Sequence, residues 1–356
     1  MGRVIGIRHR VKKTIDGESR PTQLAILENG LVQLINLKTE DDELDFIATR
    51  LLSGDRIVML LGGSGDNLAY ALSNKGQQID CKVYRISPFV FIKKIDEERD
   101  KDQDAHQLAA LFIENPELFY EVTSRDRDMI WVIECFRARI DAMKARIACE
   151  QRIRQHFIGS IFCSPQGFYP EGSIEKLFEE RKSNNHILQA LLTEEKLREK
   201  ELEKALEKVE IYIKILETVE GCGPLISARL ISAIVDIRRF ETKTKLRAFC
   251  GVHLKDGRFP RKRTGEVANW HNDARQALYL LGDQFNRRPN SIWGLKLRDK
   301  KTKLRAKHPE VEIVNGKKRY TNGHIQKMAL WWVRGKFVEW LFREWWRLEK
   351  EDTIST

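Results

Sequence analysis

Two glycines, at positions 221 and 223, flank a single small residue and are followed at once by Pro224. Glycine tolerates the backbone conformations of a tight turn, and proline suits the first turn of a helix. The segment therefore predicts a helix, a hairpin and a second helix. Because backbone N–H groups beside a helix N-terminus can bind a phosphate oxygen, Gly221 and Gly223 are candidate nucleic-acid contacts. The alternative interpretation is an ordinary turn between two core helices.

The residues after this hairpin predict a helical domain that contains a basic loop. Apolar residues at helical spacing predict a helix over residues 226–234, a short helix that ends at Gly251, and a further helix over residues 274–281. The loop before the last helix carries five cations, Lys255, Arg258, Arg261, Lys262 and Arg263. This order of elements resembles the C-terminal domain of the insertion-sequence transposases that are guided by a bridge RNA, a group that includes the Piv invertase. It is more distantly similar to the Nop domain of guide-RNA ribonucleoproteins, which is built around a helix-hairpin-helix arrangement.

The first 122 residues predict an α/β domain. Three apolar segments, at residues 4–7, 23–27 and 31–37, predict antiparallel strands, and Asn29-Gly30 between the last two is typical of a hairpin. A helix, a strand, a helix, a strand and a final helix over residues 103–114 are expected to follow. This order resembles an RNase H or RuvC-type fold, which is also the N-terminal fold of the bridge-RNA transposases.

The resemblance implies a catalytic site of carboxylates around two metal ions, but several of its positions are substituted in this chain. The transposases place an Asp after Gly-Ile on the first strand, where this chain has Arg8. Their last pair is Asp-x-x-Asp-Ala, in which Asp104 is retained and Lys101 takes the first position. Their nucleophilic serine corresponds to Asp256, which cannot form a phosphoserine linkage. We therefore expect no working catalytic site and no metal site at these degenerate positions.

A shifted set of carboxylates is the alternative. Asp100 and Asp104 lie four residues apart on one helical face, and Asp102 or Asp66 could approach them. Against this alternative, the substituted cations would place positive charge where the metal ions bind.

Composition favours a nucleic-acid partner. The chain has 356 residues and a formal net charge of +11, and a field of that sign attracts phosphate backbones. The six cysteines form no Cys-x-x-Cys pair and the eight histidines no His-Glu-x-x-His motif, so we expect reduced thiols, no structural zinc and no cofactor. Because there is neither an apolar run of about eighteen residues nor a signal peptide, we expect a cytoplasmic protein without a membrane partner.

Residues 123–216 predict two long antiparallel helices that pair as a coiled coil. Apolar residues repeat at spacings of three and four over residues 133–147 and again over residues 202–216. Proline and glycine residues in the segment 160–172 break the first helix, and residues 174–192 predict a shorter helical excursion. In the transposases that the chain resembles, such a coil extends from the body and helps the protein dimerise, so we expect a homodimer.

The C-terminal domain, residues 217–356, contains a dense basic block with few matching acids, which favours a polyanion as its partner. The block and the short basic segment after it comprise Arg287, Arg288, Lys296, Arg298, Lys300, Lys301, Lys303, Arg305, Lys307, Lys317, Lys318 and Arg319. Trp293 and Tyr320 are placed either to stack on bases or to pack in a core. Five tryptophans within residues 331–346 follow a helical spacing that mainly predicts packing, with an aromatic platform for nucleic acid as the alternative.

With the cutting chemistry replaced and the nucleic-acid scaffold retained, the chain looks like the nuclease-lacking Tas proteins of the tandem interspaced guide RNA systems. The resemblance implies a protein that binds a guide RNA and targets DNA by RNA–DNA pairing, without nuclease activity of its own. The implied partners are a guide RNA, target DNA, a second copy of the chain and, in one form of the hypothesis, a separate nuclease. Two alternatives stay open: an active RNA-guided DNA transposase, and an RNA-only ribonucleoprotein scaffold of the Nop type.

Overall fold

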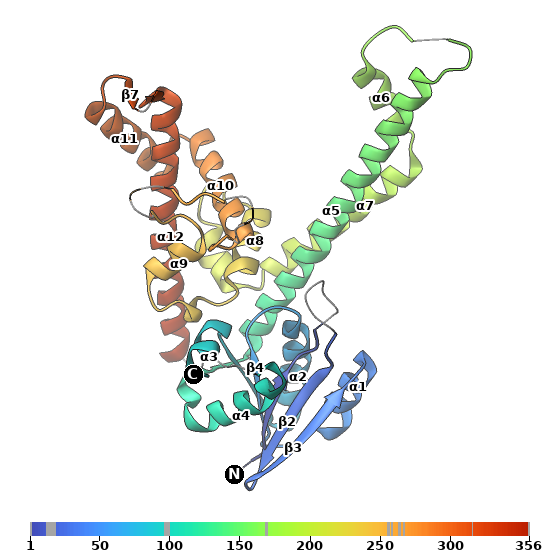
Figure 1. Ribbon diagram of the computed structural model, residues 1–356, viewed down its shortest axis with the longest axis vertical. Helices are drawn as coiled ribbons and strands as arrows, with labels where there is room; N and C mark the ends of the chain where they lie inside the picture. Colours follow the sequence, from blue (N-terminus) through green and yellow to red (C-terminus); the bar gives the residue numbers. More distant parts are fainter. Residues whose placement is uncertain are drawn as a thin grey trace. The chain divides into compact units, whose positions relative to one another are not determined.

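The computed structural model divides into two units, Met1–Ile130 and Trp131–Thr356, which are described one at a time (Figure 1). The residues whose structure is described are 2–11, 19–95, 100–167, 170–254, 257, 259–262, 265, 268–314 and 316–354. The predicted combination of an α/β part and a helical part is confirmed, because all strands of the large sheet lie in the first unit. The predicted domain boundaries at residues 122 and 216 stay predictions.

The first unit is built on one mixed sheet of six strands, in the order β3-β2-β1-β4-β5-β6. Strands β1, β4 and β5 are parallel, and β2, β3 and β6 are antiparallel to their neighbours. The strands are β1 Val4–Arg8, β2 Thr22–Glu28, β3 Leu31–Leu37, β4 Arg56–Leu60, β5 Lys82–Ile86 and β6 Tyr120–Glu121. Asn29 and Gly30, with φ of 48° and 80°, form the expected two-residue hairpin between β2 and β3.

Helices cover both faces of this sheet. They are α1 Glu40–Asp45, which continues as a π-helical turn Phe46–Arg50, α2 Gly65–Ile79, α3 Pro88–Lys94, a 3-10 turn Lys101–Gln103 and α4 Asp104–Glu114. Because side chains alternate along a strand, Ile5 and Ile7 pack with Leu68 and Leu72 of α2, while Val4 packs with the core that includes Leu108 of α4. Helix α3 and strand β6 are not among the elements that the sequence predicts.

Gly6 lets α4 approach the central strand directly. A Cβ atom at this position would lie 1.8 Å from the carbonyl oxygen of Ala105 and 3.0 Å from the amide nitrogen of Ala109. No side chain fits there, because both neighbours are backbone atoms of α4. The start of α4, which carries Asp104, is therefore held against the end of β1, which carries Arg8.

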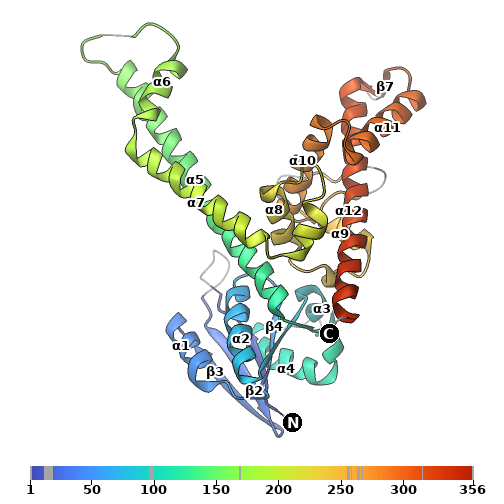
Figure 2. The same ribbon diagram turned by 180° about the vertical axis from the view of Figure 1, so that it is seen from behind.

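The long helix α5, Ser124–Phe162, begins in the first unit and continues into the second, where it lies beside α7, His186–Leu206 (Figures 1 and 2). Glu195 of α7 pairs with Arg139 at 3.2 Å and with Arg146, and Glu199 lies 3.7 Å from Arg139. Since Glu199 contacts only the earlier of the two arginines, the helices run antiparallel. A shorter helix, α6 Ile174–Ser183, connects them.

Two details of the predicted helical pair are wrong. The apolar series over residues 202–216 does not occupy one helix, because α7 ends at Leu206 and a π-helical turn, Tyr212–Leu216, follows a break. The predicted excursion over residues 174–192 is also interrupted, because the side chain of Asn185 accepts a hydrogen bond from the Leu188 amide at 2.9 Å and starts α7 there.

Among the described residues, the rest of the second unit consists of helices, connecting loops and one small hairpin. Its elements are α8 Pro224–Ile234, a 3-10 turn Ile237–Arg239, α9 Lys243–Phe249, α10 Asn272–Arg287, α11 Ile292–Lys307, strands β7 Glu312–Val314 and β8 Lys317–Arg319, and α12 Asn322–Ile354. Helix α12 packs against α9, α10 and α11. Phe285, Trp293, Phe337 and Trp340 form an aromatic cluster at the junction of α10, α11 and α12.

Within the described part of the chain, no helix combines the length and the apolar character that a membrane crossing requires. All six cysteines are free thiols, of which Cys81, Cys135, Cys222 and Cys250 are buried and Cys163 is exposed. Burial raises the pKa of Cys81 and Cys250 to about 12 and that of Cys222 to about 11.

Replacing Gly6 by Ala is expected to destabilise the first unit by about 1–3 kcal/mol or more, because the new methyl group would collide with the backbone of α4. Urea unfolding followed by circular dichroism measures the loss of stability. Tryptophan fluorescence would not, because all eight tryptophans lie at or beyond position 131 and report the second unit. Gly159→Ala in α5 is the control, where a Cβ meets nothing within 4 Å and a gain of up to about 1 kcal/mol is expected. Equal stabilities for both variants would contradict the close approach of α4.

Thiol reagents at pH 8 are expected to label Cys163 rapidly and the half-buried Cys149 more slowly. Only the thiolate reacts, and the raised pKa of Cys81, Cys222 and Cys250 keeps these three thiols protonated until the pH approaches 11–12. Mass spectrometry of labelled peptides before and after denaturation tests the expectation. Rapid labelling of Cys250 in the native protein would show that its surroundings open.

Candidate nucleic-acid interface

The hairpin between residues 219 and 224 has the geometry that its two glycines predict. Gly221 has φ of 90°, in the region that favours glycine, and Gly223 is the N-cap residue of α8 with Pro224 as the first helical residue. Hydrogen bonds close the turn: the Cys222 amide donates to the Val219 carbonyl at 2.8 Å. The Ser227 hydroxyl, in turn, donates to the Cys222 carbonyl at 3.1 Å.

One predicted cation lies directly against this hairpin. A Cβ on Gly221 would lie 2.7 Å from Gln284 Cβ and 3.3 Å from Arg288 Nη1, so the C-terminal turn of α10 packs on the turn residue. The Arg288 guanidinium donates to the side-chain oxygen of Gln284 and is exposed. Gly223 is exposed, with nothing within 4 Å of its Cβ position. The structure therefore brings Gly221, Gly223 and Arg288 together beside the N-terminus of α8, where the helix dipole favours an anion.

Helix α11 carries most of the basic block, and one side of the helix is anchored. Trp293, Leu297 and Leu304 are buried. The exposed cations are Lys296, Arg298, Lys303 and Lys307, while Lys300, Lys301 and Arg305 are half-buried. The helix is therefore anchored by three buried apolar residues, while Ile292 and Leu295 are exposed together with the four exposed cations.

The cations of this block differ in whether a carboxylate already neutralises them. Lys303 pairs with Asp299 at 2.7 Å, and Arg287 at the end of α10 pairs with Asp283 at 2.8 Å. Amide oxygens bind two more, Asn286 at 3.2 Å from Lys301 and Asn322 at 2.7 Å from Arg305. Within the described residues, no carboxylate pairs with Lys296, Arg298, Lys300 or Lys307. We call these four residues the unpaired cations of α11, because no carboxylate neutralises them. Lys296 and Lys300 lie over the rings of Trp293 and Trp332, at 4.2 Å and 5.2 Å from the ring centroids.

Several predicted contacts cannot be placed. Lys255, Asp256, Arg258 and Arg263 lie outside the described residues, as does the side chain of Lys317. The other basic residues of the two segments, Arg261, Lys262, Lys318 and Arg319, are exposed.

Trp293 and Tyr320, for which base stacking and core packing are alternative predictions, both have packing partners. Trp293 is buried in the cluster with Phe285 and Phe337, which favours the core role for its ring. Tyr320, with φ of 55°, stacks on His308 with ring centroids 3.7 Å apart and an interplanar angle of 5°. Its ring face on that side is therefore already occupied.

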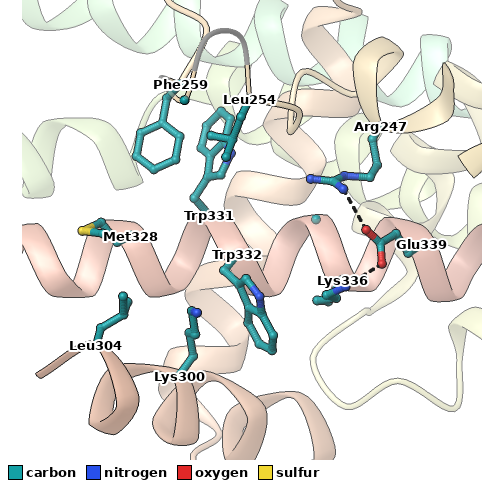
Figure 3. Close-up of a pocket in the computed structure, with 12 residues that line it drawn as sticks. Arg247, Leu254, Phe259, Lys300, Leu304, Met328, Trp331, Trp332, Lys336 and Glu339 are labelled. Carbon is teal, nitrogen blue, oxygen red and sulfur yellow. Dashed lines mark hydrogen bonds and ion pairs between the residues drawn. The ribbon is translucent and has the colours of Figure 1, made fainter. Parts of the chain in front are cut away.

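Sequence reasoning missed a pocket on α12. Trp331 and Trp332 belong to a helical pattern that mainly predicted packing, yet both line a pocket of about 350 Å³ together with Phe259 and Lys300 (Figure 3). Nearby, Arg275 stacks on Trp270 at 4.2 Å and on Trp331 at 5.4 Å, and burial lowers the pKa of Arg275. The signal in the sequence was the spacing of Met328, Trp331 and Trp332, which alone does not distinguish a pocket wall from a packed face.

In the first unit, the position at which the resemblance places the first-strand carboxylate holds a buried cation. Arg8 is 8% exposed, and its guanidinium lies 3.5 Å from Asp102 and donates to the Pro21 carbonyl at 3.4 Å. Asp104 is buried at the first residue of α4, and Lys101 is exposed on the 3-10 turn before it. Asp100 accepts the Asp102 amide at 2.9 Å, which makes it a cap of that turn.

Asp66 belongs to the alternative, shifted set of carboxylates. Its side chain already accepts hydrogen bonds from other groups. It accepts from Arg85 of β5 at 3.0 Å and from the Gly62 amide at 3.0 Å, and it is 1% exposed. Arg85 also lies 3.9 Å from Asp126. No three His, Cys, Asp or Glu side chains gather into a metal-binding group among the described residues.

Comparison with known families identifies the segment that holds the hairpin. Residues 213–282 match the family model described as the Transposase IS116/IS110/IS902 family. The match covers the hairpin, α8, α9 and most of α10, which confirms that this part of the chain is transposase-like. A comparison with curated proteins gave no significant match.

Gly221→Ala is expected to cost about 1–3 kcal/mol of stability, because the left-handed backbone and the contact with Gln284 both disfavour a side chain. Gly223→Ala is the matched control, with a cost below about 1 kcal/mol, since its φ of −68° suits any residue and its Cβ position is open. Urea unfolding followed by tryptophan fluorescence compares the two. A larger loss for Gly223→Ala would contradict the hairpin geometry.

Proposed function

We propose that this chain binds a guide RNA and finds target DNA through base pairing between that RNA and one DNA strand, without cutting the DNA itself. The observation that carries the proposal is the combination of a transposase-like hairpin segment with the unpaired cations of α11 in the same unit. Protein contacts in such a complex would be made mainly to phosphates, and base pairing would supply the sequence specificity.

The charge distribution of the second unit supports binding to a polyanion. Lys296, Arg298 and Lys307 are exposed on α11 and unneutralised, and Arg288 adds a cation beside the N-terminus of α8. Cations that lack carboxylate partners repel each other in the free protein, and a phosphate backbone relieves that repulsion while it releases its own counterions.

Features of the first unit support the proposal that the chain does not cut DNA itself. Its strand order, with β2 antiparallel to β1 and β4 and β5 parallel to it, is compatible with the RNase H or RuvC-type fold that the sequence resembles. In that fold a metal-binding carboxylate belongs at the position of Arg8, whose buried guanidinium would oppose a metal ion. We infer that this unit serves as a folded platform.

The guide RNA as partner rests on the resemblance to Tas and Nop-type proteins. We further propose that the chain forms a homodimer and that any cutting is done by a separate nuclease. A monomeric mass in sedimentation equilibrium at micromolar concentration would overturn the dimer.

A second candidate function is an active RNA-guided transposase, which the family match over residues 213–282 favours. It requires divalent metal and strand transfer or cleavage of DNA. Metal-dependent cleavage that Asp104→Ala abolished would establish this function and refute ours. The third candidate, an RNA-only scaffold, would bind RNA without any guide-dependent affinity for DNA.

The first test is to express the chain with its native flanking DNA, purify it without nuclease treatment and sequence the bound RNA. A discrete short RNA encoded beside the gene is expected, and DNA complementary to its spacer should then bind only to the RNA-loaded protein. Random RNA fragments or none would refute guide binding.

A triple variant of Lys296, Arg298 and Lys307 to Gln is expected to weaken RNA binding and to reduce the slope of log K against log salt by about 0.7 per lost contact with single-stranded RNA. The matched control replaces Lys245, Arg287 and Lys303, which are equally cationic but each paired with a carboxylate. Filter binding at several salt concentrations measures both. Equal losses would show that net charge alone, and not this surface, determines binding.

A further inference from the structure

A pocket of about 350 Å³ opens between α11, α12 and three residues that come after α9, Leu254, Gly257 and Phe259 (Figure 3). Its apolar wall consists of Leu254, Phe259, Leu304, Met328, Trp331 and Trp332. This volume is at the lower end of the range of about 300–1,000 Å³ that is usual for small-ligand sites, so the pocket suits one planar group of nucleobase size.

One face of α12 forms the floor of the pocket. Met328, Trp331, Trp332, Gly335 and Glu339 recur at spacings of three and four residues, so they lie on one side of the helix. The core residue Phe337, by contrast, faces the aromatic cluster and is 0% exposed. Gly335 has no side chain and so leaves space in the pocket, where a Cβ would lie 3.3 Å from Arg247 Nη2.

The aromatic rings of the pocket provide stacking surfaces. The rings of Phe259 and Trp331 lie 4.4 Å apart and form one wall, and Trp332 projects separately toward α11 (Figure 3). Lys300 places its ammonium group 5.2 Å from the Trp332 ring, a cation–π contact that holds the cation at the pocket. Rings of this kind stack on unpaired bases of any sequence.

The charged groups of the pocket favour a ligand that carries phosphate. Arg247 and Lys336 both pair with Glu339, at 2.7 Å and 2.8 Å, so one carboxylate is shared by two cations. Lys300 has no carboxylate partner among the described residues. The pocket therefore carries an excess of positive charge, and through Lys300 it is continuous with the unpaired cations of α11.

We propose that this pocket holds one unpaired nucleobase of a single-stranded nucleic acid whose phosphates lie along the unpaired cations of α11. The base stacks on the indole of Trp332, and Lys300 contacts the adjacent phosphate. This inference rests on the proposed function and adds to it a site that recognises a base as well as a backbone.

The test compares a 12-nucleotide adenylate RNA with an RNA of the same length that has abasic positions, by fluorescence anisotropy. The wild-type protein is expected to bind the base-containing RNA at least about fivefold more tightly. Trp332→Leu should remove this difference. Trp346→Leu is the matched control, since it removes a half-buried indole from the same helix but outside the pocket, and it should keep the difference.

The wild-type comparison does not depend on how well the variants fold. Equal affinity of the wild type for the two RNAs, or equal effects of the two variants, would overturn the pocket and leave the proposed function standing. A wild-type protein that bound neither RNA nor DNA would overturn both. The same oligomers made of deoxyribonucleotides distinguish the source of the base: a larger base-dependent gain with RNA assigns the pocket to the guide, and with DNA to the displaced strand.

Discussion

Burial of Trp293 between α10 and α12 is the interaction on which the arrangement of the second unit depends. Its ring contacts Phe285, Phe337 and Trp340, so a single side chain of α11 joins three helices. Because Trp293, Leu297 and Leu304 are buried, the rotation of α11 is fixed. This rotation exposes Lys296, Arg298, Lys303 and Lys307 and leaves Lys300, Lys301 and Arg305 half-buried. The same packing sets Lys300 beside Trp332 and so connects the charged surface to the aromatic pocket.

The two units differ in the charge that lies beside a constrained backbone. In the second unit, Gly221 has a left-handed turn conformation, and Arg288 lies against it. In the first unit, α4 lies directly against β1 at Gly6. The end of β1 and the start of α4 carry one buried cation, Arg8, and one buried carboxylate, Asp104.

Elements governed by local rules could be predicted from the sequence, and those governed by distant contacts could not. Asn29-Gly30 and Pro224 specify their turns through backbone conformation alone, and both predictions are confirmed. The apolar spacing that continues past Leu206 predicted a helix that is too long, because the same spacing repeats across residues 207–209, where the chain leaves the helix. Strand β6 spans two residues, too few to show an alternating pattern, and it pairs with β5. For the candidate site, the cations were identified by charge, but their neutralisation by Asp283 or Asp299 and the pocket on α12 depend on the folded arrangement.

The contacts of Arg8 bear on what a metal site at this junction would require. Arg8 is 8% exposed and lies 3.5 Å from Asp102, which also pairs with Arg20 at 3.1 Å. Replacing Arg8 by an acid would place a second negative charge close to Asp102 at a buried position, at a cost in stability that only a bound metal ion could offset. A single substitution at this position would therefore be unfavourable until the remaining ligands of a metal site were also present.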